Sequence, residues 1–447
     1  EQLRELYFQR YAKSWSEFIA GLSVVAPTEM KIALDELRVI SASDGPYVRL
    51  FKVISENVRL DVTPPKTLAE QALEKGKAAA EAKLADAGVD AGAAAPARVV
   101  SPVERQFEPL LIFGFGEASA GKADAAPSKL SLYLAQLTTL EAALGQLAET
   151  NASPAQEFDA ALSRTATSVQ TLLGGLDPRT RMILEPLLMN PIRGSRKGVM
   201  NADFASLSES WQKEVWEAYS TKLAPRYPFA DAPAEVSLAE FTDFFRPDSG
   251  LLWKFFATNL ATRLERAGNT YVPKAAADAL PFRPDFLQCL NVAAEITDAT
   301  FGGAQIASVP FGIKIHPAGS NIAEISLAID GANTVYRNEP ERWMPVTWPG
   351  TGSPHGAVLQ VRGAGFTDEI PRLGDFGLLR LLEAGGLKPG AALAEGAGVL
   401  SGSWTLSRAG EAPVTIDLRP AKSVHPFAKG FFRRLRCPQA ITTASAQ

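Results

Sequence analysis

In GGAQIASVPFGIKIHPAGSNIAEISLAID, residues 302–330, the spacing of apolar residues changes, and this change indicates the fold class. Up to about residue 300, apolar side chains recur every three or four residues, which is typical of amphipathic helices. From Val309 onward they alternate with polar or small residues, and this two-residue period indicates strands. The sequence therefore predicts an α+β multidomain protein, helical over its N-terminal two-thirds and ending in a β-sandwich.

Further short strands are expected in the C-terminal part of the chain. Asp330-Gly331 is a turn signal between strand candidates on either side. The strand candidates are 309–315, 325–329, 334–336, 357–361, 402–406 and 414–418, with one helix at 375–383. Short strands with frequent turns favour a sandwich.

The helical part is expected to contain several units, because 447 residues are too many for one ordinary core. Apolar spacing predicts helices at 1–25, 29–39, 47–60, 129–149, 154–173, 178–189, 203–219, 238–245, 251–266 and 282–299. Separators that contain Gly and Pro, such as 190–198, predict breaks between them.

The domain boundaries follow from these patterns. We predict a helical bundle segment at 1–61, an Ala-rich linker at 62–100, helical domains at 101–200 and 201–300, the β-sandwich at 301–440 and a disordered tail at 441–447. The linker prediction depends on 66–98, where helix formers and charges occur almost without large apolar residues.

Charge and cysteine content exclude several classes of protein. A net charge of -4 gives no global attraction to polyanions, so no nucleic-acid partner is expected. The basic run of Arg433, Arg434 and Arg436 beside Lys429 is interleaved with phenylalanines, which favours a charged outer face on an apolar stretch. Two cysteines, Cys289 and Cys437, are too few for a disulfide framework and too far apart in sequence for a local zinc motif, and whether they pair is left open.

The chain shows neither a secretory leader nor a membrane-span pattern. It begins at Glu1 without a charged and then apolar leader, and no window approaches the ~18 apolar residues of a span. We expect it to be a soluble portion of a longer protein.

One segment imitates a catalytic motif. Gly116–Lys122 has the glycine spacing and the lysine of a phosphate-binding loop. However, Ala123 replaces the hydroxyl residue that would bind magnesium, and Pro127 falls where the phosphate-facing helix should continue. A polar linker that matches by chance is the favoured interpretation, and nucleotide hydrolysis at 116–122 is kept as the enzymatic alternative.

The histidines give no local catalytic or metal motif. His316 falls in a strand candidate, His355 in a Gly/Pro-rich turn, and His425 before Pro426, and none is placed i, i+4 to another. Each is interpreted as structural or hydrogen-bonded. A catalytic set assembled through the fold is left open, because its partners need not be neighbours in sequence. We assign no catalytic, cofactor-binding or metal-binding residue and expect the chain not to be an enzyme.

Three of the seven tryptophans, Trp343, Trp348 and Trp404, belong to the predicted β domain. Aromatic side chains on a sandwich can stack on sugars or contact proteins, but most pack in the core. The core is therefore the first interpretation and a protein interface the second. A peptidoglycan- or glycan-binding module is the non-enzymatic alternative.

Several segments together resemble one family. They are Leu6-Tyr-Phe with Trp15, Arg226-Tyr-Pro-Phe229, Val236–Phe241, Phe244–Leu252, Phe255-Phe256, Ile329-Asp-Gly331 with Tyr336, Trp348-Pro-Gly350, Gly377–Leu382, and the ending His425-Pro-Phe427 to Arg436-Cys-Pro438. In this order they resemble the C-terminal part of the TssM/IcmF family, inner-membrane proteins of the type VI secretion system. The insertion at 66–98 departs from that pattern, as does Gly374-Asp-Phe376, where Gly-Pro-Trp is expected.

The resemblance implies a role for the chain. It implies the periplasmic portion of the family's inner-membrane protein, a structural strut whose β domain, 301–440, docks a TssJ-type outer-membrane lipoprotein. It also implies association with a TssL-type inner-membrane protein in the full-length context, and self-association into a ring. No single partner-binding residue is assigned.

Overall fold

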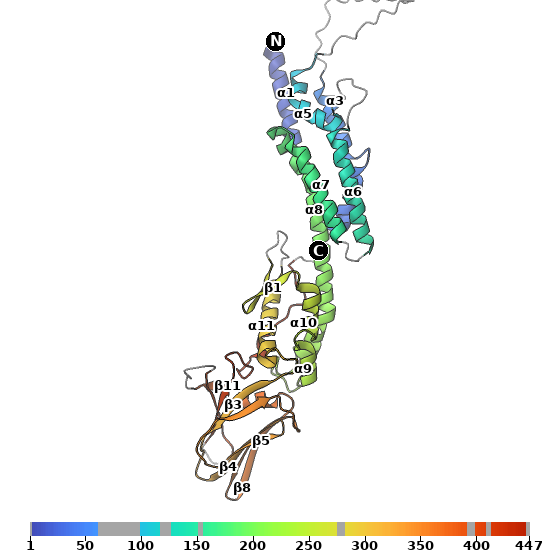
Figure 1. Ribbon diagram of the computed structural model, residues 1–447. Coiled ribbons are helices and arrows are strands. Elements are labelled where there is room, and N and C mark those ends of the chain that lie inside the picture. Colours follow the sequence, from blue (N-terminus) through green and yellow to red (C-terminus); the bar gives the residue numbers. More distant parts are fainter. Residues whose placement is uncertain are drawn as a thin grey trace, which may run out of the picture. The chain divides into compact units, whose positions relative to one another are not determined.

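The computed structural model describes residues 2–60, 99–116, 127–150, 155–274, 282–390, 398–407 and 413–443. They belong to two compact units, 1–202 and 203–447, and the chain passes from one to the other inside helix α8 (Figure 1). The α+β class is confirmed, with helices before the β-rich C-terminal region. The Ala-rich segment 66–98 lies outside the described residues.

The first unit is built from seven described helices. They are α1 (Gln2–Ala20), α2 (Met30–Ser41), α3 (Pro46–Val58), α5 (Pro102–Phe115), α6 (Lys129–Thr150), α7 (Ala155–Gly174) and α8 (Pro178–Trp211). Gly114 of α5 allows α3 to approach closely, because a Cβ there would stand 2.6 Å from the ring of Phe51. That ring stacks on Phe113 with a centroid distance of 5.7 Å. The apolar faces predicted for 29–39 and 47–60 are buried in this core.

The predicted break at 190–198 is wrong, because helix α8 runs through that segment. Its glycines serve as a docking surface: a Cβ on Gly194 would stand 2.2 Å from Pro27, and one on Gly198 would stand 2.9 Å from Met30. Asn190 and Asn201 donate side-chain hydrogen bonds to carbonyls of the same 24–30 segment. Here glycine permits close packing rather than ending the helix.

The helical part of the second unit follows α8. It comprises π-helical turns η2 (Gln212–Trp216), η3 (Tyr219–Leu223) and η4 (Phe256–Leu260), helices α9 (Leu238–Phe245), α10 (Leu251–Phe255) and α11 (Pro284–Phe301), and strands β1 (Leu264–Ala267) and β2 (Thr270–Pro273). The predicted helix 251–266 is wrong at its end, because the chain turns at Gly268, φ 64°, and forms the β1–β2 hairpin.

The C-terminal strands form two antiparallel sheets. The strands are β3 (Val309–Ile315), β4 (Ile322–Ile329), β5 (Ala332–Tyr336), β6 (Met344–Trp348), β7 (Gly356–Gly363), β8 (Phe366–Leu373), β9 (Lys388–Pro389), β10 (Leu400–Trp404) and β11 (Val414–Pro420). One sheet has five strands in the order β6-β3-β11-β10-β9, and the other has four in the order β5-β4-β7-β8. Figure 1 labels β3 and β11 of the first sheet and β4, β5 and β8 of the second.

Helix α12 (Gly377–Ala384) contributes to the sandwich core. One small cavity is lined by side chains from both sheets and from α12: Phe311, Ile313, Leu327, Leu378, Leu381, Leu382, Trp404, Ile416 and Leu418. The indole nitrogen of Trp404 donates to the Leu381 carbonyl at 2.9 Å. The ring covers Gly385, where a Cβ would stand 2.2 Å away.

The last described residues belong to the helical part of this unit. The predicted tail at 441–447 begins too early, because Ile441 is buried and its carbonyl accepts from the Arg283 backbone N–H at 2.9 Å. Trp211 donates to the Pro438 carbonyl at 2.9 Å, and Tyr219 to the Leu435 carbonyl at 3.0 Å. Residues 435–442 therefore complete the core around α11.

Candidate partner-binding surface of the C-terminal domain

The outer face of the five-stranded sheet carries a polar network. Alternation along β3 turns Pro310, Gly312 and Lys314 outward, since Val309, Phe311, Ile313 and Ile315 are buried. In the register of β3 with β11, Lys314 lies opposite Asp417 and Gly312 opposite Arg419. Outward-facing groups from distant parts of the sequence thus meet on one face.

His316 is the centre of this network. Its Nδ1 lies 2.9 Å from a carboxylate oxygen of Glu341, and its Nε2 lies 2.8 Å from one of Asp417. Lys314 Nζ lies 3.6 Å from Glu341 and 3.4 Å from Asp417. Burial disfavours the charged imidazole, but the hydrogen bonds to Asp417 and Glu341 outweigh it and raise the pKa of His316. The network fastens the segment before β6 to β3 and β11.

Trp343, just before β6, packs against this face at Gly312. Gly312 leaves room for it, since a Cβ there would stand 3.3 Å from the indole. The guanidinium carbon of Arg419 lies 4.7 Å from the indole centroid, and Lys314 Nζ lies 5.4 Å from it. The indole is therefore covered by cations, which are attracted to its electron-rich face.

Asp330 organises the exposed loop between β6 and β7. The carboxylate is 1% exposed, and it accepts the backbone N–H of Gly350 at 2.7 Å and that of Gly356 at 2.8 Å. Its backbone has φ 46°, a conformation that Asp tolerates better than most residues. Since a buried carboxylate must be compensated, these two bonds hold both ends of 350–356 in place. His355 lies on the loop with its Nδ1 3.9 Å from Asp330 and 3.8 Å from Asp375.

A polar joint fastens α12 to the segment before α9. Glu235 accepts from the Phe376 backbone N–H at 2.9 Å and from the Arg380 guanidinium at 3.1 Å. The guanidinium carbon of Arg380 stacks 3.8 Å from the centroid of Tyr227. Asp375 in turn accepts the backbone N–H of Leu238 at 2.6 Å, which satisfies a donor at the start of α9.

An apolar joint reinforces the polar one. Phe241 of α9 packs on Phe376 with a centroid distance of 5.7 Å and on Phe432 at 5.8 Å. Phe376 also packs on Trp348 at 5.6 Å. The Phe of Gly374-Asp-Phe376, a departure from the family pattern, thus fills the core between helices and sandwich.

Cys289 and Cys437, whose pairing the sequence left open, form a disulfide. Cys289 is fully buried on α11, and the bond joins positions separated by 148 residues. It ties the end of the chain to the helical part of the unit.

The remaining predicted residues take structural positions. Trp348 and Trp404 are buried in the core, whereas Trp343 is half-buried under its cations. His425 stacks on Phe427 at 5.7 Å, and burial lowers the pKa of His425. In the basic run, Arg433 pairs with Glu383 at 3.0 Å and Arg434 pairs with Glu295. In the part of the chain that the structure describes, no three His, Cys, Asp or Glu side chains are grouped to hold a metal ion.

The segment that resembles a phosphate-binding loop is Gly116–Lys122. Most of it lies outside the described residues, which omit 117–126. The segment before it is the helix α5, which ends at Phe115 with Gly116 as its C-cap, and not the strand that precedes a phosphate-binding loop. Across the described ranges, no helix is long and apolar enough to cross a bilayer.

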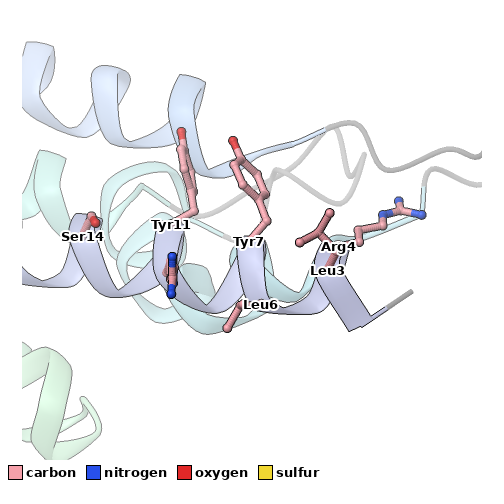
Figure 2. A pocket seen from close by; sticks show the side chains of 7 residues that line it. Leu3, Arg4, Leu6, Tyr7, Tyr11 and Ser14 are labelled. Carbon is pink, nitrogen blue, oxygen red and sulfur yellow. The ribbon is translucent and has the colours of Figure 1, made fainter.

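A second exposed surface lies on α1. A pocket of about 740 Å³ is lined by Leu3, Arg4, Leu6, Tyr7, Arg10, Tyr11 and Ser14. Figure 2 shows Tyr7 and Tyr11 projecting side by side from the helix, with Leu6 on the opposite side. Leu3 is 81% exposed and Tyr7 57% exposed. None of the residues that line the pocket comes from another described element.

Sequence reasoning missed Asp330, Glu341 and Asp417 as organising residues. The pair Asp330-Gly331 was interpreted only as a hairpin turn, yet the same carboxylate fixes the neighbouring loop. The sequence feature that could have indicated this role of Asp330 is the glycine-rich stretch at 350–356, whose backbone N–H groups need an acceptor. Glu341 and Asp417 meet His316 only through the register of the strands, which no local pattern encodes.

Known family profiles match separate parts of the chain that correspond to the helical and β-rich regions described above. Profiles of the type VI secretion protein IcmF helical domain and C2-like domain match residues 203–305 and 311–407. A third profile, IcmF-related, described as intracellular multiplication and human macrophage-killing, matches 1–59.

A curated relative is the type VI secretion system component TssM1 of Pseudomonas aeruginosa, 26% identical over 361 residues, which are 78% of this chain and 32% of the relative. The chain thus spans about a third of the length of that relative.

Two solved structures share the fold. A chain of a type VI secretion system membrane core complex has a TM-score of 0.68 at 20% identity, covering 98% of this chain and 84% of that one. A chain of a type VI membrane complex has a TM-score of 0.57 at 20% identity, covering 98% and 85%.

The fold and the surface define a multidomain protein in which a C2-like sandwich is fastened to a helical domain by an aromatic core and an ion pair, while a disulfide anchors the segment after the sandwich to that helical domain. With the matching profiles and the curated relative, the chain belongs to the TssM/IcmF family of type VI secretion proteins.

Proposed function

We propose that this chain is the periplasmic part of an inner-membrane-anchored structural subunit of the type VI secretion membrane complex. It acts as a strut between the inner membrane and a TssJ-type outer-membrane lipoprotein, and the β domain 301–440 carries the lipoprotein site. Further contacts with a TssL-type protein and with other copies of the subunit, arranged in a ring, belong to the same proposal. The role is mechanical and not catalytic.

The observation that carries the proposal is the joint within the second unit. A strut transmits force only if its domains are fastened to each other, and here the Phe241–Phe376 packing and the Glu235–Arg380 ion pair fasten the sandwich to the helices. The disulfide anchors the segment that follows the sandwich to α11. The disulfide also supports a periplasmic location of the chain, since such bonds persist in oxidising compartments.

The two alternatives receive less support. A sugar-stacking platform needs open indole faces, but Trp348 and Trp404 are buried and Trp343 is covered by Arg419 and Lys314. Nucleotide hydrolysis needs a strand before the phosphate loop, where this chain has α5. ATP or GTP at millimolar concentration should therefore leave the melting temperature unchanged.

The test is titration calorimetry of the whole chain with the soluble domain of the TssJ-type lipoprotein encoded beside it. The whole chain is used because a cut at 300/301 would separate Cys289 from Cys437 and Phe241 from Phe376. We expect saturable one-to-one binding. No heat and no co-migration at high micromolar concentration would refute the docking role.

A further inference from the structure

A pocket of about 290 Å³ lies where the end of α11, the start of β3 and the end of β11 meet. Most of the residues that line it are apolar, among them Phe301, Val309 and Pro310. Lys422 also lines it and contributes a positively charged ammonium group. Small-molecule sites have volumes of about 300–1,000 Å³, so this pocket suits a single anchoring side chain.

The pocket opens beside the outer face of the five-stranded sheet. Pro310 is exposed on that face, and the backbone N–H of Ala421 donates to its carbonyl at 3.3 Å. Both residues line the pocket. The next outward-facing pair on these strands is Gly312 with Arg419. Arg419 therefore lies beside the rim of the pocket.

The two cations at this end, Arg419 and Lys422, have no acidic partner among the described residues. Arg419 is exposed, and among the described residues its guanidinium makes no hydrogen bond or ion pair, only the contact with the Trp343 ring at 4.7 Å. Exposed Lys422 likewise has no ion pair within the described ranges, and its Nζ lies near Gly302 at the end of α11. By contrast, Lys314 and His316 on the same face are paired with Glu341 and Asp417.

The contact with the indole of Trp343 orients the Arg419 guanidinium for binding an anion. It restricts the motion of the guanidinium, while the N–H donors of that group are unused by the described residues. A planar guanidinium held in this way matches a carboxylate by two parallel hydrogen bonds and loses little rotamer entropy on binding.

We propose that this pocket, together with Arg419 and Lys422, docks an acidic segment of a partner protein that inserts one apolar side chain. The apolar side chain fills the cavity, and flanking carboxylates pair with the two cations. The inference rests on the proposed function, to which it adds the face of the β domain and the chemistry of its partner.

Three labelled peptides test this chemistry by fluorescence anisotropy with the whole chain at low salt. The first carries Leu-Phe between Glu-Asp pairs, the second replaces the acids by Gln and Asn, and the third replaces Leu-Phe by Ala-Ala. We expect only the first to bind saturably, with an affinity that falls at higher salt. Equal binding of the neutral peptide, or no binding of the acidic apolar one at millimolar concentration, would overturn the proposal.

Variants then locate the site. Arg419→Glu with Lys422→Glu should weaken the first peptide about tenfold or more, and Ala304→Trp at the exposed rim should do so by covering the pocket. Lys388→Glu is the matched control, because this exposed cation lies on the edge strand β9 of the same sheet. Unchanged melting temperatures exclude misfolding as the cause. Equal losses in the control would refute the location.

The same variants separate this inference from the proposed function. If the lipoprotein domain binds the wild-type chain and binds the Arg419→Glu, Lys422→Glu variant equally well, the docking role stands and this surface is wrong. If the peptides behave as expected and the lipoprotein does not bind, the surface stands and its partner is another acidic protein.

Discussion

The phenol of Tyr47 on α3 donates its hydrogen bond to the Leu187 carbonyl inside α8. In a regular helix that carbonyl would accept from the residue four positions later, but this residue is Pro191, which has no N–H. Tyr47 is buried, and burial raises its pKa. A tyrosine from another helix thus satisfies the acceptor that a proline leaves unpaired.

Removing that hydroxyl should destabilise the first unit. Tyr47→Phe leaves the Leu187 carbonyl buried without a donor, at an expected cost of about 1–3 kcal/mol. Pro191→Ala supplies a helical N–H for the same carbonyl, so the cost of Tyr47→Phe should shrink in that background. Denaturant midpoints of the four proteins in this cycle measure the coupling.

Tyr11→Phe provides the control for that cycle. Tyr11 donates to the Asn57 carbonyl at 2.9 Å, but the site is only partly buried, so water can replace the hydroxyl and the loss should be smaller. A Tyr47→Phe cost that is the same with and without Pro191 would contradict the proposed pairing.

The disulfide should carry much of the stability of the second unit. Replacing Cys289 and Cys437 by Ala together should cost about 2–5 kcal/mol, because the bond closes a long loop and holds the segment that completes the core. Circular-dichroism melting with and without dithiothreitol measures this. The reductant should lower the melting temperature of the wild type and leave the double variant unchanged. A wild type insensitive to full reduction would show that the bond is dispensable.

Apolar periodicity predicted most elements because it depends on the burial of one face. The helices at 129–149 and 238–245 and the strand at 309–315 lie where the pattern placed them. Periodicity failed where a residue type serves tertiary packing: the glycines at 194 and 198 predicted a break, yet they admit a neighbouring segment against α8.

The strands β6 and β8 were not predicted, and both are edge strands that contain a proline. An edge strand tolerates Pro345 or Pro371, because half of its N–H groups need no partner in the sheet. The site was less predictable than the fold. His316 meets Asp417 through strand order, and a single sequence does not reveal that order.

Asp330 should be essential for the loop 350–356. Asp330→Ala leaves the N–H groups of Gly350 and Gly356 without their acceptor, and Asp330→Asn turns one acceptor oxygen into a donor, so each should cost about 1–3 kcal/mol. Hydrogen exchange of 349–356 should accelerate in both variants. The exposed Asp243→Asn is the control, with an expected change within about 0.5 kcal/mol. Unchanged exchange in the Asp330 variants would show that other contacts hold the loop.

Two of the three histidines, His316 and His425, should affect stability with opposite dependence on pH. Hydrogen bonds to Asp417 and Glu341 raise the folded-state pKa of His316 against the effect of burial. Its contribution is therefore complete below the unfolded pKa of about 6.5 and is lost as pH rises through the higher folded pKa. The stability difference between wild type and His316→Gln should shrink from pH 5.5 to pH 8.5, by up to about 1 kcal/mol.

His425 supplies the opposite case, since burial alone lowers its pKa. The folded state prefers its neutral form, so wild type should lose stability relative to His425→Gln as pH falls below about 6.5. Denaturant midpoints at pH 5.5, 6.5, 7.5 and 8.5 for the three proteins measure both trends. If the two differences change with pH in the same direction, the ion pairs of His316 do not hold the segment before β6 in solution.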